Sequence, residues 1–316
     1  LVVVNHMEVL ENRVLLTADY IFDAETAGLE SGFAYDVTSA EDGTPELRDA
    51  STQAVVPWTS QVTSGDAEPV NISITGSGFD DSLRVSAAAS DFQITFSAGA
   101  GADTLTAGDS DNIWTVIGAD QGTLNESLVF SEVENLTGNA GASDHFTIRD
   151  GGSISGLIQG NAPDGDFDRL TFEILAGSSD NTTARTFDFV EPAQDEDGVP
   201  ITTDYSTLVD GVVVATYLDL ATTDELLIRL PEVPSGVLGH NAVLSSDTQN
   251  YLKLTSSDTN ATFQPIEFRQ PYKEITLFLG GGGRLNGIRH WCFDRFASDG
   301  SRWWRWGRHS CSSSRP

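Results

Sequence analysis

The stretch DFQITFSAGAGADTLTAGDSDNIWTV (residues 91–116) decides the expected fold. It holds three short apolar runs separated by two turns that are rich in Gly, Ala, Asp and Ser. Glycine permits left-handed backbone turns, and Asp side chains bond to the backbone of the turns in which they lie. Apolar and polar residues alternate within the runs, as in a half-buried β-strand. The stretch therefore predicts short strands joined by tight turns.

Related units recur at residues 133–148 and 154–174. Each has an apolar run, a turn of Gly, Asn or Asp, and a second apolar run, so we expect residues 91–180 to form a repeat region. The alternation predicts which side chains form its core. These are Trp114, Phe130, Leu136, Phe146 and Ile158.

The segment AGAGADTLT (98–106) resembles the Gly-Gly-x-Gly-x-Asp-x-apolar-x nonapeptide of RTX (hemolysin-type) proteins, which forms a calcium-binding parallel β-helix. Gly99, Gly101, Asp103 and Leu105 fall in register with it, with an Ala in place of the first Gly. The segments AGDSDNIW (107–114) and GNAGASDHF (138–146) are partial copies. The resemblance implies a fold of parallel β-helix or β-roll repeats.

The same resemblance makes calcium the expected cofactor. Calcium takes six to eight oxygen ligands, so one site needs two stacked repeats, and the best pair in sequence is 98–106 with 107–114. The candidate ligands are Asp103, Asp109, Asp111, Asn112 and Asp144, with Asp164, Asp166 and Asp168 as weaker candidates. The alternative is that these side chains only shape turns.

The segment LENRVLLTAD (10–19) resembles the LEPR-XLL motif found near the N-terminus of very large exported bacterial proteins. It matches at Leu10, Glu11, Arg13, Leu15, Leu16, Ala18 and Asp19. The segment allows a short amphipathic helix but lacks the continuous apolar core of a secretory signal peptide. Residues 111–160 also resemble a module of giant surface adhesins. These resemblances imply an extracellular or cell-surface protein and no particular chemistry.

The charge of the chain limits its partners. The 316 residues carry a net charge of −30, which makes nucleic acid an unfavourable partner and favours divalent cations. Residues 1–283 contain no Cys, so disulfides and thiolate metal sites cannot form there. No apolar run is long enough for a membrane span.

Residues 284–316 have a different composition. They hold 7 of the 17 basic residues, 4 of the 6 Trp and both Cys, but only 2 of the 47 acidic residues. Suppose that Arg is encoded by CGN and Ser by TCN. The codons of RWWRWGRHSC (302–311), read one nucleotide later, can then encode a Gly- and Asp-rich sequence that resembles the repeats. We therefore predict an out-of-frame, disordered tail. The alternative is a genuine basic, aromatic arm.

The whole chain is accordingly expected to be all-β, with β-helix or β-roll-like repeats, β-sandwich-like or irregular β segments and a short N-terminal helix. The expected units are an N-terminal motif (1–20), a β-rich segment of unknown role (21–90), the repeat region (91–180), a second β-rich module (181–283) and the tail (284–316).

The expected function is that of a calcium-binding, non-catalytic fragment of an exported surface adhesin. Residues 1–283 contain three scattered His, and no catalytic, phosphate-binding or dinucleotide-binding motif occurs. Glycans or cell surfaces are the expected partners. Two alternatives stay open. One is a carbohydrate-binding module with an exposed platform drawn from Tyr205, Tyr217, Tyr251 and Tyr272; the other is a β-helix enzyme acting on polysaccharides.

Overall fold

The computed structural model describes residues 20–61, 70–86, 92–161, 168–177, 183–190, 205–218, 220, 225–231, 242–246, 251–257, 262–269, 274–278, 288–294 and 303–307. All regular secondary structure in these residues is β-strand, so the expected all-β fold is confirmed. The expected N-terminal helix and the LEPR-XLL-like segment lie outside the described residues.

The described strands form two large mixed sheets of 13 strands each. In spatial order, sheet A consists of β26 (Trp303–Gly307), β25 (Ile288–Asp294), β24 (Glu274–Phe278), β20 (Glu225–Arg229), β16 (Arg169–Leu175), β14 (Asp144–Ile148), β10 (Asn112–Gly118), β11 (Gln121–Leu124), β12 (Leu128–Ser131), β8 (Gln93–Ser97), β6 (Asn71–Thr75), β1 (Tyr20–Asp23) and β5 (Ser60–Gln61).

Sheet B consists, in spatial order, of β21 (Ala242–Ser246), β22 (Tyr251–Ser256), β23 (Ile266–Arg269), β17 (Arg185–Val190), β18 (Tyr205–Val209), β19 (Val212–Leu218), β15 (Leu157–Gln159), β13 (Asn135–Thr137), β9 (Thr104–Thr106), β7 (Ser82–Val85), β2 (Ala34–Ser39), β3 (Pro45–Asp49) and β4 (Val55–Val56).

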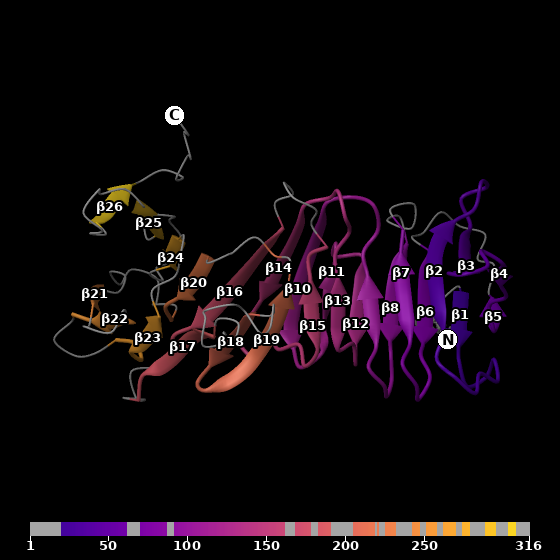
Figure 1. Cartoon of the computed structure of the whole chain (residues 1–316), viewed down its shortest axis with the longest axis horizontal. Coiled ribbons are helices and arrows are strands. Elements are labelled where there is room, and N and C mark those ends of the chain that lie inside the picture. Colours follow the sequence, from indigo (N-terminus) through magenta and orange to yellow (C-terminus); the bar gives the residue numbers. More distant parts are fainter. Residues whose placement is uncertain are drawn as a thin grey trace, which may run out of the picture.

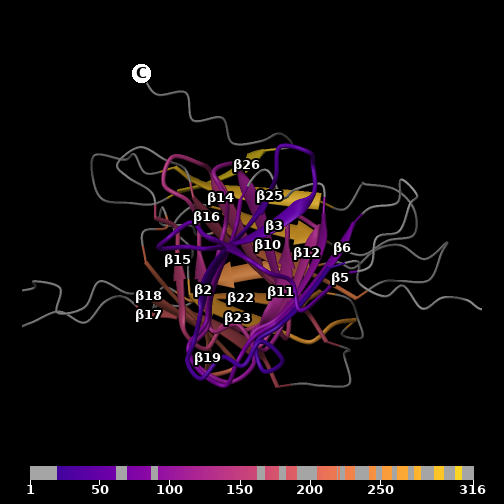
Figure 2. The same cartoon turned by 90° about the vertical axis from the view of Figure 1, so that its right-hand side faces the viewer.

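The chain alternates between the two sheets, so that one strand of each sheet makes one coil. Strands β6, β8, β14, β16 and β20 belong to sheet A, while β7, β9, β13 and β15 belong to sheet B. Neighbouring coils pair in parallel, as in β6 with β8 and β7 with β9. The coils follow one another along the long axis of the molecule (Figure 1), and Figure 2 looks along that axis. The described body is therefore a two-sheet parallel β-solenoid.

Two antiparallel meanders interrupt the coil repeat. In sheet A, β11 runs antiparallel to its neighbours β10 and β12, which pair in parallel with β14 and β8. In sheet B, β17, β18 and β19 do the same, with β19 parallel to β15 and β17 parallel to β23. Each meander adds two strands to its own sheet, so the two sheets stay equal in length and the core between them remains covered.

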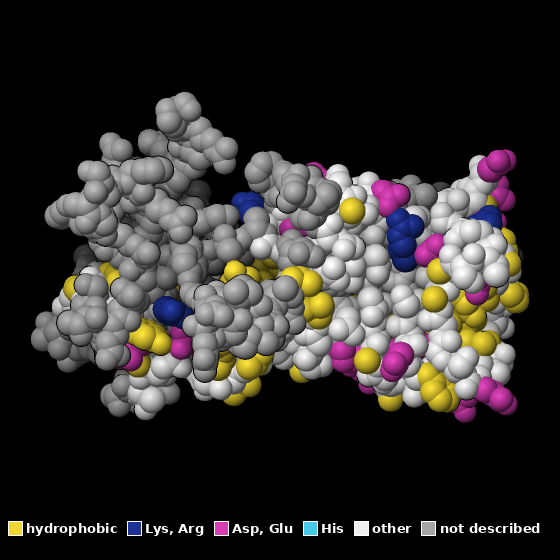
Figure 3. Space-filling view, in the orientation of Figure 1, with side chains coloured by type: hydrophobic (Ala, Val, Ile, Leu, Met, Phe, Trp, Pro, Cys, Tyr) yellow, Lys and Arg dark blue, Asp and Glu magenta, His cyan; other side chains and the backbone are white. Residues whose placement is uncertain are grey.

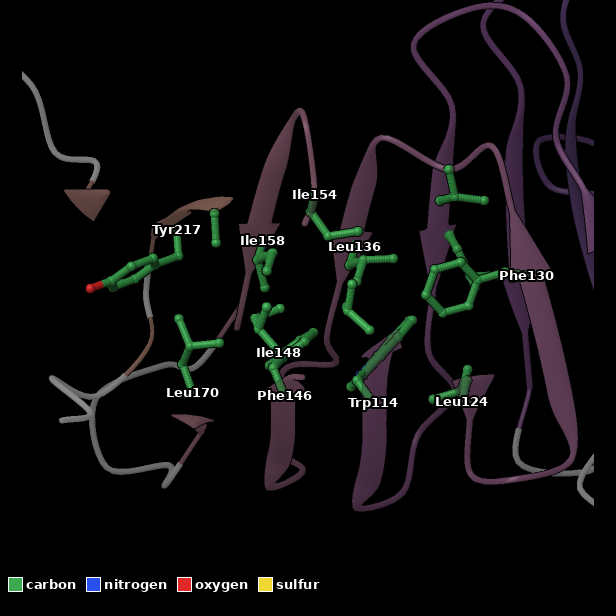
Figure 4. Close-up of a cluster of buried hydrophobic side chains, with 14 of the residues drawn as sticks. Trp114, Leu124, Phe130, Leu136, Phe146, Ile148, Ile154, Ile158, Leu170 and Tyr217 are labelled. Carbon is green, nitrogen blue, oxygen red and sulfur yellow. The ribbon is translucent and has the colours of Figure 1, made fainter. Parts of the chain in front are cut away.

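One cluster of buried hydrophobic side chains runs from Tyr20 to Leu277 among the described residues. Aromatic side chains join the sheets across it: Phe22 meets Tyr35, with ring centroids 5.3 Å apart, and Phe172 meets Phe187, also at 5.3 Å. Figure 4 shows its middle part, where Trp114 stacks on Phe146 at 5.4 Å. All five side chains that the alternation assigned to the core are buried.

Strand pairing crosses the expected domain boundaries. Strand β6 pairs with β8 across position 90, and β15 pairs with β19 across position 180. Residues 284–316, expected to be disordered, include β25 and β26, which continue sheet A as antiparallel strands beyond β24. An edge strand offers unpaired backbone groups to any extended segment, which is the physical reason such a tail can adopt strand structure.

The part of the chain that the structure describes contains no helix long and apolar enough to cross a membrane.

Candidate functional site: carboxylates on the two edges of the solenoid

Each coil has two turns, and these turns form two edges of the solenoid. Residues 98–103 connect β8 to β9 and belong to the edge at which the chain passes from sheet A to sheet B, the A-to-B edge. Residues 107–111 connect β9 to β10 and belong to the B-to-A edge. The two segments expected to share one calcium ion therefore lie in the same coil on opposite edges. Of the five candidate ligands, Asp103 lies on the A-to-B edge and the other four on the B-to-A edge.

On the B-to-A edge, the turn before β10 stacks on the turn before β14. Asn112 and Asp144 are directly paired in register, and both are buried. Asn112 Nδ2 donates to Asp144 Oδ1 at 2.7 Å, and the backbone N–H of Asn139 donates to Asp144 Oδ2 at 2.6 Å. Asp144 N–H in turn donates to Asp168 Oδ1 of the next coil at 2.7 Å. The amide and carboxylates thus link three successive coils.

Asp109 and Asp111 lie on the outside of the same edge. Asp109 forms an ion pair with Arg84 and accepts a hydrogen bond from Asn139 Nδ2 at 2.8 Å. Its side chain is 72% exposed. Asp111 Oδ1 accepts from the backbone N–H of Ser143 at 2.9 Å, again across neighbouring coils. The weaker candidates Asp164 and Asp166 lie outside the described residues.

On the A-to-B edge, carboxylates form a directional ladder. Asp81 Oδ1 accepts from Phe33 N–H at 2.9 Å, Asp103 Oδ1 accepts from Asp81 N–H at 2.7 Å, and Glu134 Oε2 accepts from Asp103 N–H at 2.8 Å. Each acid lies directly before a strand of sheet B and caps the backbone amide at the equivalent position of the preceding coil. A buried N–H needs such a partner, and a charged acceptor makes the hydrogen bond stronger.

Burial raises the pKa of two acids, Asp103 on the A-to-B edge and Asp144 on the B-to-A edge. The pKa of Asp103 is raised from 3.8 to about 6, chiefly by burial and also by the neighbouring Glu134, Asp81 and Asp80, while the hydrogen bond from Asp81 N–H lowers it. Burial also raises the pKa of Asp144, opposed by the hydrogen bonds from Asn139 and Asn112. Asp103 Oδ2 is buried and has no hydrogen-bond partner, so this oxygen carries an unmet demand for a proton or a cation.

The described side chains fit amide capping more closely than a shared calcium shell. Among the described residues there is no group of three or more His, Cys, Asp or Glu placed to hold a metal ion. Asp103 and Asp144 lie on different edges. Asp103 Oδ1 and Asp144 Oδ2 each accept a hydrogen bond from a backbone amide. The feature that fits a cation is Asp103 Oδ2.

Asp81, Glu134 and Asn139 were not among the expected site residues. The sequence holds a signal for the two acids, which is a recurring four-residue pattern. The pattern consists of an acidic residue, any residue, an apolar residue and then Thr or Arg. The pattern occurs as DSLR (81–84), DTLT (103–106), ENLT (134–137), DHFT (144–147) and DRLT (168–171). In four copies the acid accepts a backbone N–H of the preceding coil, while Asp144 accepts the side-chain amide of Asn112 there, and the apolar residue is buried in all five copies.

Glycine lets these turns approach the carboxylates. A Cβ on Gly138 would lie 2.3 Å from Asp144 Oδ2 and 2.6 Å from Gly160 O. A Cβ on Gly76 would lie 1.9 Å from Ala98 O and 2.7 Å from Asp81 Oδ2. A side chain at either position would push the turn away from the acid that it packs against.

The described tyrosines that were expected to form an exposed sugar-binding platform make contacts within the protein. Tyr217 is buried, and Tyr205 stacks on it with ring centroids 5.9 Å apart. Tyr251 donates its hydroxyl to Asp188 Oδ2 at 2.9 Å. Tyr272 lies outside the described residues. A trough of about 670 Å³ opens on the outer face of β2 and β3, where Asp36, Glu46, Arg48 and Arg84 are among the lining side chains.

The chain matches no protein-family model, no curated protein and no solved structure.

Proposed function

We propose that this chain is a rigid, non-catalytic β-solenoid segment of an exported bacterial surface protein, which works as a structural or adhesive spacer. The observation that carries the proposal is the ladder of strand-preceding acids, which joins successive coils from Phe33 to Glu134 by hydrogen bonds. Together with one continuous core, the ladder makes a long and stiff body in which each coil contacts its neighbours.

The proposed location outside the cell is supported by composition. Acidic side chains outnumber basic ones on the face shown in Figure 3, and much of the surface between them is uncharged. A strong negative charge keeps an extended protein soluble and keeps copies apart. The resemblance to LEPR-XLL and RTX-type surface proteins points the same way, and glycans or cell surfaces are the proposed partners.

Stiffness is the property to test. Small-angle scattering of the full chain should give an elongated particle whose long dimension is unchanged when salt is raised. Hydrogen exchange should show slow amides along β7, β9, β13 and β14, whose edges the acids cap. A compact particle, or fast exchange throughout these strands, would refute the spacer proposal.

Calcium binding is a second candidate function, favoured by the buried, unpartnered Asp103 Oδ2. A hard cation there would neutralise Asp103 and the neighbouring Asp80, Asp81 and Glu134, which now raise its pKa. Isothermal calorimetry of calcium into chelator-treated protein tests this. Binding that disappears in Asp103→Asn but persists in Asp109→Asn would support the site; no binding heat at any concentration would remove it.

A further inference from the structure

The outer face of sheet A carries a row of uncharged, mostly β-branched side chains. Across the six neighbouring strands β14, β10, β11, β12, β8 and β6, the residues in register at the middle outward position are Thr147, Thr115, Thr123, Val129, Thr95 and Ser73. We call this set the threonine row. It stays in register through the antiparallel meander β10–β12, although that meander interrupts the coil repeat.

A second row lies two residues further along the strands. Ser131, Ser97 and Thr75 pair in register on β12, β8 and β6 and also face outward. Strands lie about 4.8 Å apart, and alternate residues on a strand lie about 6.7 Å apart, so the two rows form a regular two-dimensional array. Ser97 Oγ donates to Glu132 Oε2 at 2.8 Å, so one charged side chain lies against the second row, and the threonine row itself is uncharged.

Exposed aliphatic side chains lie within the same face. Ile113 is 59% exposed, and Ile117 and Val129 are each 49% exposed. β-Branched Thr, Ile and Val have few χ1 rotamers, so their methyl and hydroxyl groups hold fixed positions on a stiff sheet. The threonine row contains no charged residue, although the chain carries a net charge of −30.

We propose that this face of sheet A binds the surface of an ice crystal. Hydroxyl groups at regular spacing hydrogen-bond water in fixed places, and the methyl groups between them restrict the orientation of neighbouring water. A rigid array of both kinds of group orders a flat layer of water that can merge with a crystal lattice. Charged side chains would hold their own hydration shells instead, so the uncharged composition fits an uncharged, crystalline partner.

A neutral polysaccharide is the competing occupant of such a face. Protein sites for small organic ligands are usually lined with apolar and aromatic side chains. The two rows contain no aromatic residue. The absence of a stacking platform in these rows therefore favours ice, and the experiment includes cellulose as the alternative.

The test uses the full chain and two variants that put a charge into the threonine row. Thr123→Lys lies at its centre, and Thr95→Lys lies at a more exposed position that tolerates a long side chain. The matched control is Thr137→Lys, which changes an outward, equally half-buried threonine on β13 of sheet B. Circular dichroism first checks that all four proteins have the same β content.

Ice recrystallisation and partition into slowly growing ice are then measured. The wild type and Thr137→Lys should enter ice and slow recrystallisation, and Thr123→Lys and Thr95→Lys should lose at least about tenfold in activity, because a charge would have to be desolvated against the crystal. The proposal is overturned if the wild type is excluded from ice. Equal activity in all four proteins, or binding to crystalline cellulose in place of ice, would overturn it as well.

Discussion

At the scale of single residues, an acid expected to be a calcium ligand also accepts a backbone hydrogen bond from the neighbouring coil. Asp103 accepts the amide of Asp81, and its own amide is capped by Glu134. One oxygen of Asp103 remains buried without a partner. The residue is therefore both a link between coils and a buried acid with one unpartnered oxygen.

Asp103 should make the stability of the protein depend on pH. Its folded pKa of about 6 lies above the ordinary 3.8, so the folded state binds this proton more tightly than the unfolded state. The stability contributed by the protonated form is fully present below about pH 4 and is lost as the pH rises through about 6. In Asp103→Asn, the melting temperature in chelator should exceed that of the wild type at pH 7.5, and the difference should shrink toward pH 5.

The direction of that difference is the critical result. Asn keeps the acceptor for Asp81 N–H and removes the buried charge. A melting temperature for Asp103→Asn that stays below that of the wild type across the whole pH range would show that the ionised carboxylate stabilises the fold.

Asp144→Ala should destabilise the protein by about 1–3 kcal/mol, because it removes the acceptor of Asn139 N–H and one buried hydrogen bond of Asn112 Nδ2, which still donates to Gly108 O and Ser110 O. Asp109→Ala is the control on the same edge, and should cost less than about 1 kcal/mol because its ion pair with Arg84 is exposed. Urea denaturation measures both. Equal losses would mean that burial does not distinguish the two acids.

At the scale of turns and strands, the close approach of glycines to the capping acids is the main constraint. Gly138→Ala should cost about 1–3 kcal/mol, since the new methyl group would meet Asp144 Oδ2 and Gly160 O. Gly78→Ala is the matched control, because a Cβ there meets nothing within 4 Å and should change stability by less than about 0.5 kcal/mol. Thermal unfolding of the two variants measures both effects. A Gly138→Ala variant as stable as the wild type would contradict the proposed turn packing.

The meander β17–β19 is fastened to the rest of the solenoid by Arg185. Its guanidinium pairs with Asp150 Oδ1 at 2.7 Å in the loop after β14, and with Asp210 Oδ2 at 3.1 Å in the turn between β18 and β19. The Arg185 side chain is only 17% exposed. Arg185→Met should therefore cost about 1–3 kcal/mol.

Arg84→Met provides the comparison, because Arg84 pairs with an exposed carboxylate and its loss should cost less than about 1 kcal/mol. Hydrogen exchange should also quicken in β18 and β19 of Arg185→Met alone. Unchanged exchange there would mean that the ion pair does not hold the meander.

The sequence predicted the strands better than their connections. Alternation identified Trp114, Phe130 and Phe146 as core because burial on one face of a strand leaves a period of two. It could not show that 98–106 and 107–114 lie on opposite edges, since that depends on which sheet each strand joins. The capping role of Asp81 and Glu134 was hidden for the same reason: their partners lie 48 and 31 residues away along the chain.

At the scale of the whole molecule, the two sheets remain matched although each contains a meander. The insertion β10–β12 lengthens sheet A, and β17–β19 lengthens sheet B by the same number of strands. The core can therefore continue between them, from Phe22 against Tyr35 to Phe172 against Phe187. A solenoid built in this way transmits force through hydrogen bonds between coils, which suits a spacer on a cell surface.

The edge carboxylates cap backbone amides of neighbouring coils, and this capping should hold the coils together without a metal ion. The most direct test is thermal unfolding of the full chain at pH 7.5, in chelator and in excess calcium, for the wild type and Asp103→Asn. The account predicts melting temperatures that calcium does not change in either protein, and no loss of stability in Asp103→Asn. A wild type that calcium stabilises by several degrees, together with an Asp103→Asn variant that calcium does not stabilise, would contradict it and make Asp103 a metal ligand.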